Sequence, residues 1–179
     1  MPNFRTVRFG ELDYRNEDVI HLPEGLVGMP QLRNWLILEM GDDVPMKWFQ
    51  SLDRGDFGFP VSQAYLFHDD YDFPLSNATA TRLDNQHPDD IATLIITTIH
   101  AGGDKVTGNL LAPLVIDTET RRGVQLTLDD TSYGIQQEIN YFKFGLAVNS
   151  ETAEDGATVK DTADAMAENG EQIPETVGV

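Results

Sequence analysis

The nine residues 91–99 constrain the fold of this chain more than any other stretch. All except Ala92 and Leu94 are isoleucine or threonine, which are β-branched. Such side chains have restricted χ1 rotamers and fit a pleated, half-buried surface better than a helix. The run therefore predicts a β-strand at 91–99, and a strand of this length requires neighbouring strands to satisfy its backbone.

Other short runs supply those neighbours. Alternating or apolar segments predict strands at 4–9, 12–14, 18–22, 35–40, 47–52, 57–61, 109–116, 124–128 and 135–142. The turns between the first two of these strands, at 10–11, and between 47–52 and 57–61, at 53–56, predict hairpins, and Pro60 predicts that its strand is an edge or bulged strand. Helical structure is predicted only as a short turn at 31–35 and a weak helix from an N-cap at Ser76 to Leu83. This pattern predicts an all-β fold, a small barrel-like or sandwich domain.

The composition of the 179-residue chain changes after residue 149. Residues 150–179 contain eight acids and one lysine, so they carry −7 of the net charge of −18 and leave −11 for residues 1–149. Aromatic residues are absent from that stretch. A segment with so little apolar surface cannot offset its chain entropy by burial. We expect a folded β domain at 1–149 and a disordered acidic C-terminal tail at 150–179.

Charge and composition restrict the classes of function. The net charge of −18 would repel a phosphate backbone, so we expect no direct binding to nucleic acid, whereas basic protein partners would be attracted. The absence of cysteine excludes disulfides and thiolate chemistry. With no long apolar run and no signal peptide at the start, we expect a cytoplasmic protein that does not contact a membrane.

The acidic loop at 68–73 is the best candidate for metal chemistry. Asp69, Asp70 and Asp72 follow His68, and carboxylate and imidazole groups are common metal ligands. Adjacent residues of an extended segment point to opposite faces, however, and the spacing matches no calcium loop. A solvated loop is the simpler interpretation, and a metal-dependent hydrolase is kept as an alternative. The remaining histidines and the serines form no catalytic pattern. We predict no cofactor and no catalytic residues.

Residues 20–30 combine apolar side chains with turn residues. Pro23 and Pro30 fix φ, and Gly25 and Gly28 can adopt positive φ. This pattern is typical of an ordered loop packed against a core. The loop is either a turn between strands or a binding loop, and these residues alone do not decide between them.

Five short segments of the chain carry a family resemblance when they are taken in order. They are Phe9-Gly10-Glu11-Leu12, Ile20 to Gly28 around Pro23-Glu24-Gly25-Leu26, Phe49-Gln50-Ser51-Leu52-Asp53, Asn109 to Ile116 around Ala112-Pro113, and Leu128-Asp129-Asp130-Thr131-Ser132-Tyr133. Together they resemble the FliW family of flagellar assembly factors, and independent weak motifs in the same order compound into a specific match. Three positions depart from the family pattern. Arg54 follows Asp53 where proline is frequent, Gln63-Ala64 replace an Asp-Pro pair before the aromatic segment, and 135–138 replace an arginine- and histidine-containing segment.

The resemblance implies a small β-barrel-like protein without enzymatic activity and with two partners. One is flagellin, and the other is CsrA, the RNA-binding repressor of flagellin translation. Family members are expected to bind CsrA away from its RNA-contacting surface and prevent its binding to mRNA, with flagellin competing for the same factor. A generic acidic scaffold that binds basic proteins through its tail is a further alternative.

Partner contacts are predicted in two apolar segments and at one aromatic residue. Proline and glycine limit the entropy lost on binding, and exposed apolar side chains would supply burial. The opposing interpretation is that both segments only shape the fold. The predicted contact residues are Leu22, Pro23, Glu24, Gly25, Leu26, Asn109, Leu110, Leu111 and Tyr133.

Overall fold

The computed structural model describes residues 1–41, 44–84, 87–101, 105–129 and 132–139. The predicted tail at 150–179 lies outside these residues. The strands are β1 (Asn3–Thr6), β2 (Gly10–Asp13), β3 (Ile20–His21), β4 (Asn34–Glu39), β5 (Met46–Ser51), β6 (Gly58–Gln63), β7 (Ile91–Ile99), β8 (Val106–Gly108), β9 (Leu114–Asp117), β10 (Gly123–Gln125) and β11 (Gln137–Glu138). The helices are α1 (Asn77–Leu83) and three 3-10 turns, η1 (Asn16–Asp18), η2 (Ala64–Leu66) and η3 (Pro88–Asp90).

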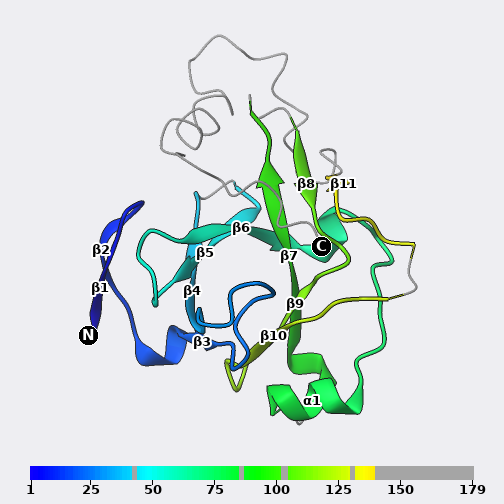
Figure 1. Cartoon of the computed structure of the whole chain (residues 1–179), viewed down its shortest axis with the longest axis horizontal. Coiled ribbons are helices and arrows are strands. Elements are labelled where there is room, and N and C mark those ends of the chain that lie inside the picture. The colour runs from blue at the N-terminus through cyan, green and yellow to red at the C-terminus, as the bar shows by residue number, and fades with distance from the viewer. Residues whose placement is uncertain (42–43, 85–86, 102–104, 130–131, 140–179) are drawn as a thin grey trace.

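The main sheet has the strand order β10-β9-β7-β6-β5-β4-β3, with β8 pairing to β7 and β11 to β8. All of the strand pairs are antiparallel. The hairpin β1–β2 forms a separate sheet that projects from one side, and α1 lies near β9 and β10 at the opposite end (Figure 1). The prediction of a small all-β domain is confirmed.

The sheet is open, but its two ends meet. Its terminal strands β3 and β10 are joined by one isolated parallel bridge between His21 and Arg122, in which the His21 amide donates to the Arg121 carbonyl over 2.8 Å. The architecture is therefore barrel-like without a continuous ladder around the circumference.

Local signals located most elements correctly. The strand predicted at 91–99 is β7, and the hairpin predicted around 53–56 is β5–β6. The Ser76 hydroxyl accepts a hydrogen bond from the Thr79 amide at the start of α1, as expected for an N-cap. The first hairpin turns at residues 7–9 and not at 10–11 as predicted, because the Thr6 hydroxyl binds both the Phe9 amide and the Gly10 carbonyl at 3.0 Å.

Other predicted boundaries shift. No helical segment forms at 31–35, where β4 begins instead. The apolar run 109–116 becomes a loop followed by β9, which begins after Pro113. Only Gln137–Glu138 of the predicted last segment forms a strand, and that segment continues beyond the described residues.

The prediction that Pro60 marks an edge or bulged strand is wrong. Pro60 pairs with Trp48 in β6, which lies between β5 and β7 inside the sheet. Pairing between β6 and β7 begins only at Val61. Proline lacks an N–H but needs no partner on that side, because β7 has not yet joined the ladder at this position.

An aromatic cluster forms the centre of the core. Trp35 on β4 stacks on Phe49 of β5 with ring centroids 4.6 Å apart, and both side chains are fully buried. Phe57 and Phe59 pack against this pair. Such aromatic pairs contribute more stability than the area they bury accounts for. This cluster therefore fixes the position of the loop that enters β4.

Candidate partner-binding site

Loop 22–30, which links β3 to β4, is ordered by its own backbone. The Gly25 amide donates to the Leu22 carbonyl over 3.0 Å, and Leu26 and Met29 exchange two backbone hydrogen bonds. Gly25 has φ +68°, and a Cβ there would lie 2.6 Å from the Met29 carbonyl oxygen. Only glycine fits such a position, so the glycine in this motif has a structural reason.

The predicted contact residues of this loop divide into two groups. Leu22 and Leu26 are buried in the same core cluster as Trp35, and Gly25 is also buried. Their side chains hold the loop in place, and the premise that they are exposed to a partner is not met. Glu24 is exposed and Pro23 is half-buried, and the neighbouring Val27 is 63% exposed. The outer face of the loop therefore includes these three residues, together with the exposed Gly28 and Pro30.

Two arginines that are distant in sequence flank the outer face of loop 22–30. The Arg82 guanidinium, from the last turn of α1, forms two hydrogen bonds with the Glu24 carboxylate, one of them 2.6 Å long. Arg122 donates from Nε to the Arg82 carbonyl over 3.2 Å. Pro23, Glu24, Arg82, Arg122, Gly123 and Val124 line a small pocket at this place. The sequence analysis missed Arg82 and Arg122 as site residues, because nothing local connects them to Glu24.

The second predicted segment, residues 109–113, is connected to loop 22–30 through Gln125. The Gln125 side chain accepts a hydrogen bond from the Val27 amide at 2.9 Å and donates to the Ala112 carbonyl at 3.4 Å. Asn109 is half-buried, and its side chain accepts from the Leu111 amide at 3.1 Å, which shapes the turn before Pro113. Gln125 was also missed by the sequence analysis, and it joins two segments that were predicted separately.

The three predicted residues of this segment differ in exposure. Leu110 is fully buried, so its side chain contributes to the core, whereas Asn109 and Leu111 are half-buried. The Leu110 amide donates to the Gly134 carbonyl over 3.0 Å. The segment thereby reaches the chain around Tyr133, and the structure brings all three predicted parts into one continuous set of contacts.

Tyr133 is half-buried and organises the acidic loop at 68–73. Its hydroxyl accepts from the Asp72 amide at 2.9 Å, and its ring lies 4.6 Å from Tyr71 and 5.4 Å from His68. The Tyr71 hydroxyl donates to the Leu110 carbonyl over 2.6 Å. Burial, with a further contribution from Tyr133, raises the pKa of Tyr71 well above its ordinary value. The tyrosines thus have a structural function in addition to any contact they make.

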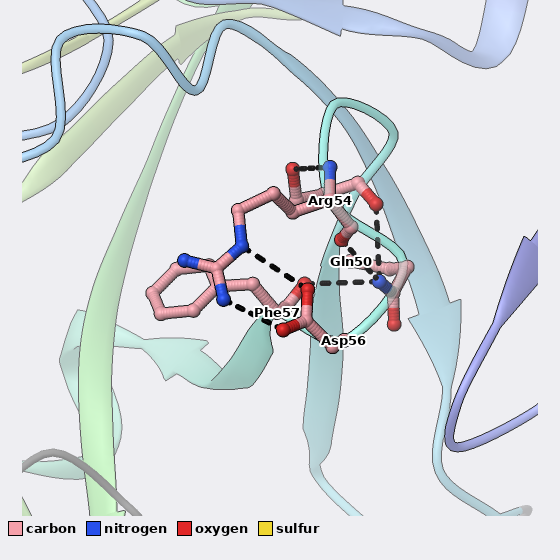
Figure 2. Close-up of polar contacts among 5 residues, drawn as sticks. Gln50, Arg54, Asp56 and Phe57 are labelled. Carbon is pink, nitrogen blue, oxygen red and sulfur yellow. Dashed lines mark hydrogen bonds and ion pairs between the residues drawn. The ribbon is translucent and has the colours of Figure 1, made fainter.

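The motif at 49–53 has a structural function. The buried Gln50 side chain donates to the carbonyls of Ser51 and Phe57 at 3.0 and 2.9 Å, and Arg54 forms a bidentate pair with Asp56 (Figure 2). Asp53 accepts bonds from the amides of Arg33 and Asn34 at the start of β4. Burial alone would raise the pKa of the Asp53 carboxyl, but these hydrogen bonds outweigh burial and lower the pKa.

No group of three or more histidine or acidic side chains is placed to hold a metal ion among the residues that the structure describes. His68 instead contacts the edge of Tyr133. The hydrolase alternative built on 68–72 thus has no structural observation in its favour. A helix long and apolar enough to cross a membrane is also missing from the described part of the chain.

A family model described as FliW protein matches residues 3–139, more than three quarters of the chain. The chain belongs to the FliW family. A flagellar assembly factor FliW from Caldanaerobacter subterraneus subsp. tengcongensis is 36% identical over 135 residues, which cover 75% of this chain and 90% of that protein. One from Alkaliphilus metalliredigens is 32% identical, covering 72% and 80%. A crystal structure of the flagellar assembly factor FliW superposes with a TM-score of 0.71 at 24% identity, covering 76% of this chain and 96% of that one.

The loop at 22–30, the segment at 109–113 and Tyr133 all lie within residues 3–139, which the family model matches.

Proposed function

We propose that this chain is a non-enzymatic, cytoplasmic binding protein that binds flagellin and the translational repressor CsrA. By binding CsrA it relieves the repression of flagellin translation, and flagellin competes for it. The observation that carries this proposal is the family match over residues 3–139. The domain boundary near 149 and the contact residues on the outer face of the described domain are part of the same proposal.

The charge of the chain supplies a physical mechanism for CsrA antagonism. A net charge of −18, of which −11 lies in residues 1–149, would be brought close to a basic RNA-binding surface when the two proteins dock. Repulsion between this charge and the phosphate backbone lowers RNA affinity without covering the RNA site. Binding sites coupled in this way influence one another reciprocally, so bound RNA also weakens binding of the antagonist.

The contact surface follows from the exposed members of the predicted residues. Glu24 and Pro23 on loop 22–30, Asn109 and Leu111 at the second segment, and Tyr133 are all at least partly exposed. Leu22, Leu26 and Leu110 support these residues from the core. Variants that test binding should therefore alter the first group and leave the leucines intact.

A competition experiment tests the partners and the mechanism. Purified chain, CsrA and flagellin are mixed pairwise and together, and RNA binding by CsrA is measured at low and high salt. We expect both proteins to bind the chain in a mutually exclusive manner, and inhibition of RNA binding to weaken as salt screens the charges. Failure of either protein to bind contradicts the proposal. Salt-independent inhibition, after correction for the salt dependence of RNA itself, contradicts the repulsive mechanism only.

A further inference from the structure

The pocket beside loop 22–30 concentrates positive charge in a chain that has 30 acidic and only 12 basic residues. Four of the eight arginines form a salt bridge with an acid in the described structure, and Arg82 is one of them, through Glu24. Arg122, which lines the same pocket, has no carboxylate oxygen within 4.0 Å in the described part of the chain, and its one side-chain hydrogen bond there is to the Arg82 carbonyl.

Glu24 does not neutralise Arg122. Both oxygens of its carboxylate are taken by the Arg82 guanidinium, so the pocket retains one net positive charge. A guanidinium has five N–H donors, and only Nε of Arg122 is used among the described residues. The other donors are available for a bidentate bond to a planar acid.

The adjacent Arg121 does not line the pocket. It lies in the turn between β9 and β10 with φ +55° and donates from Nη2 to the Asp18 carbonyl over 2.8 Å. Its Nε is buried without a hydrogen-bond partner in the described structure. A left-handed backbone at a non-glycine residue and an orphaned buried donor both carry a cost in stability.

We infer that the pocket at Pro23, Arg82, Arg122 and Gly123 is a binding site for a carboxylate group of an acidic peptide segment. Two features select this chemistry. The guanidinium of Arg122 matches a carboxylate in shape and charge, and Pro23, Gly123 and Val124 form apolar walls beside it that can contact the aliphatic part of an acidic side chain. The overall negative charge disfavours a long polyanion such as RNA more strongly than a short acidic peptide, which brings fewer negative charges to the surface.

Two sources can supply this carboxylate, and the inference is independent of the proposed partners. One is the chain itself, whose residues 150–179 contain eight acids. Tethering removes the repulsion that an acidic molecule meets when it approaches from solution, because the segment is already at high local concentration. The other source is an acidic segment of a different protein.

The test uses the full-length chain and a capped tetraglutamate peptide, with capped tetraglutamine as the uncharged reference. Binding is followed through the backbone amide NMR signals of Glu24, Gly123 and Val124. We expect these signals to move with tetraglutamate alone, and R122Q to weaken the affinity about tenfold or more. The matched control R54Q, at an arginine paired with Asp56 elsewhere, should leave the affinity unchanged. An unchanged amide spectrum away from the pocket verifies that R122Q is folded.

Equal shifts with both peptides, or equal affinity of R122Q and R54Q, would overturn the inference. A third full-length variant, with the eight acids of 150–179 replaced by their amides, identifies the source. If its affinity for tetraglutamate rises several-fold over the unmodified chain, the tail occupies the pocket. If its affinity is unchanged, the carboxylate belongs to another protein, and the site stands in either case.

Discussion

Loop 22–30 and the acidic loop 68–73 are held in place in opposite ways. Loop 22–30 is anchored by buried leucines and by backbone hydrogen bonds across a glycine turn. Its acid, Glu24, is paired with Arg82. Loop 68–73 is held by the rings of Tyr71 and Tyr133, and no salt bridge in the described structure involves Asp70 or Asp72.

The difference shows that a recognisable motif need not be a contact surface throughout. In loop 22–30 most of the conspicuous residues maintain the backbone, and only the outer face can meet a partner. In loop 68–73 the carboxylates point outward and the aromatic residues support them. Stability variants should therefore have large effects within the first loop and smaller, pH-dependent effects beside the second.

The largest effect is expected from Leu26→Ala. Removing a buried leucine leaves a cavity beneath loop 22–30 and should lower the free energy of unfolding by about 2–5 kcal/mol. Denaturant unfolding followed by circular dichroism measures this loss. Val27→Ala at the exposed neighbouring position serves as the control and should change stability by about 0.5 kcal/mol or less. Equal effects at the two positions would show that the leucine does not anchor the loop.

Gly25→Ala should have the next largest effect on stability. The added methyl group meets the backbone of Met29 and Pro30 at 2.6 Å, in addition to the strain of positive φ. Gly28→Ala shares the positive φ of +81° but meets no atom within 4 Å, so it should cost only the left-handed penalty of about 1–2 kcal/mol. Thermal unfolding of both variants compares them, and a Gly25 variant no less stable than the Gly28 variant would contradict the observed close approach.

For the second loop, Tyr71→Phe should change the alkaline response of the protein. The pKa of Tyr71 is raised in the folded state, so its stabilising contribution is complete below about pH 10 and is lost as pH rises toward the higher folded-state pKa. The wild-type protein should lose more stability than Tyr71→Phe between neutral pH and pH 11 in denaturant titrations. Tyr65→Phe, at a 55% exposed site, should retain the wild-type response. If the stability of Tyr71→Phe falls with rising pH as much as that of the wild type, another group governs the response in this pH range.

The smallest effect is expected at the Glu24–Arg82 pair. Both side chains are more than one third exposed, so water screens the attraction, and a double-mutant cycle with Glu24→Gln and Arg82→Gln should give a coupling energy of about 0.2–1 kcal/mol. The pair is therefore expected to matter for the charge of the pocket more than for stability. A coupling energy several times larger would mean that the Glu24–Arg82 pair is held as rigidly as the leucine-anchored interior of loop 22–30.

Elements governed by nearby residues could be predicted from the sequence. The β-branched run of β7, the glycine-containing turn of β5–β6 and the Ser76 cap of α1 each depend on residues within a few positions. The position of Pro60 inside the sheet could not be predicted in this way, because it depends on where β7 joins β6.

The candidate site was predictable only in outline. The turn chemistry of Pro23 and Gly25 identified loop 22–30, but exposure was assigned to Leu22 and Leu26, which the core buries. Apolar side chains in a loop look alike in sequence whether they face solvent or the interior. The partner of Glu24 lies 58 positions away, and no periodicity connects residues so far apart.

The bridge between His21 and Arg122 is the junction where the two ends of the open sheet meet. Adjacent strands elsewhere in the main sheet share at least two paired residues, whereas this junction has one. Backbone pairing therefore resists local opening least at this junction, and the buried side chains of Ile20 and Leu22 supply the remaining resistance. This junction also lies beside the arginine pocket, which contains residues from both ends of the sheet. A carboxylate bound there would stabilise the contact between these two ends.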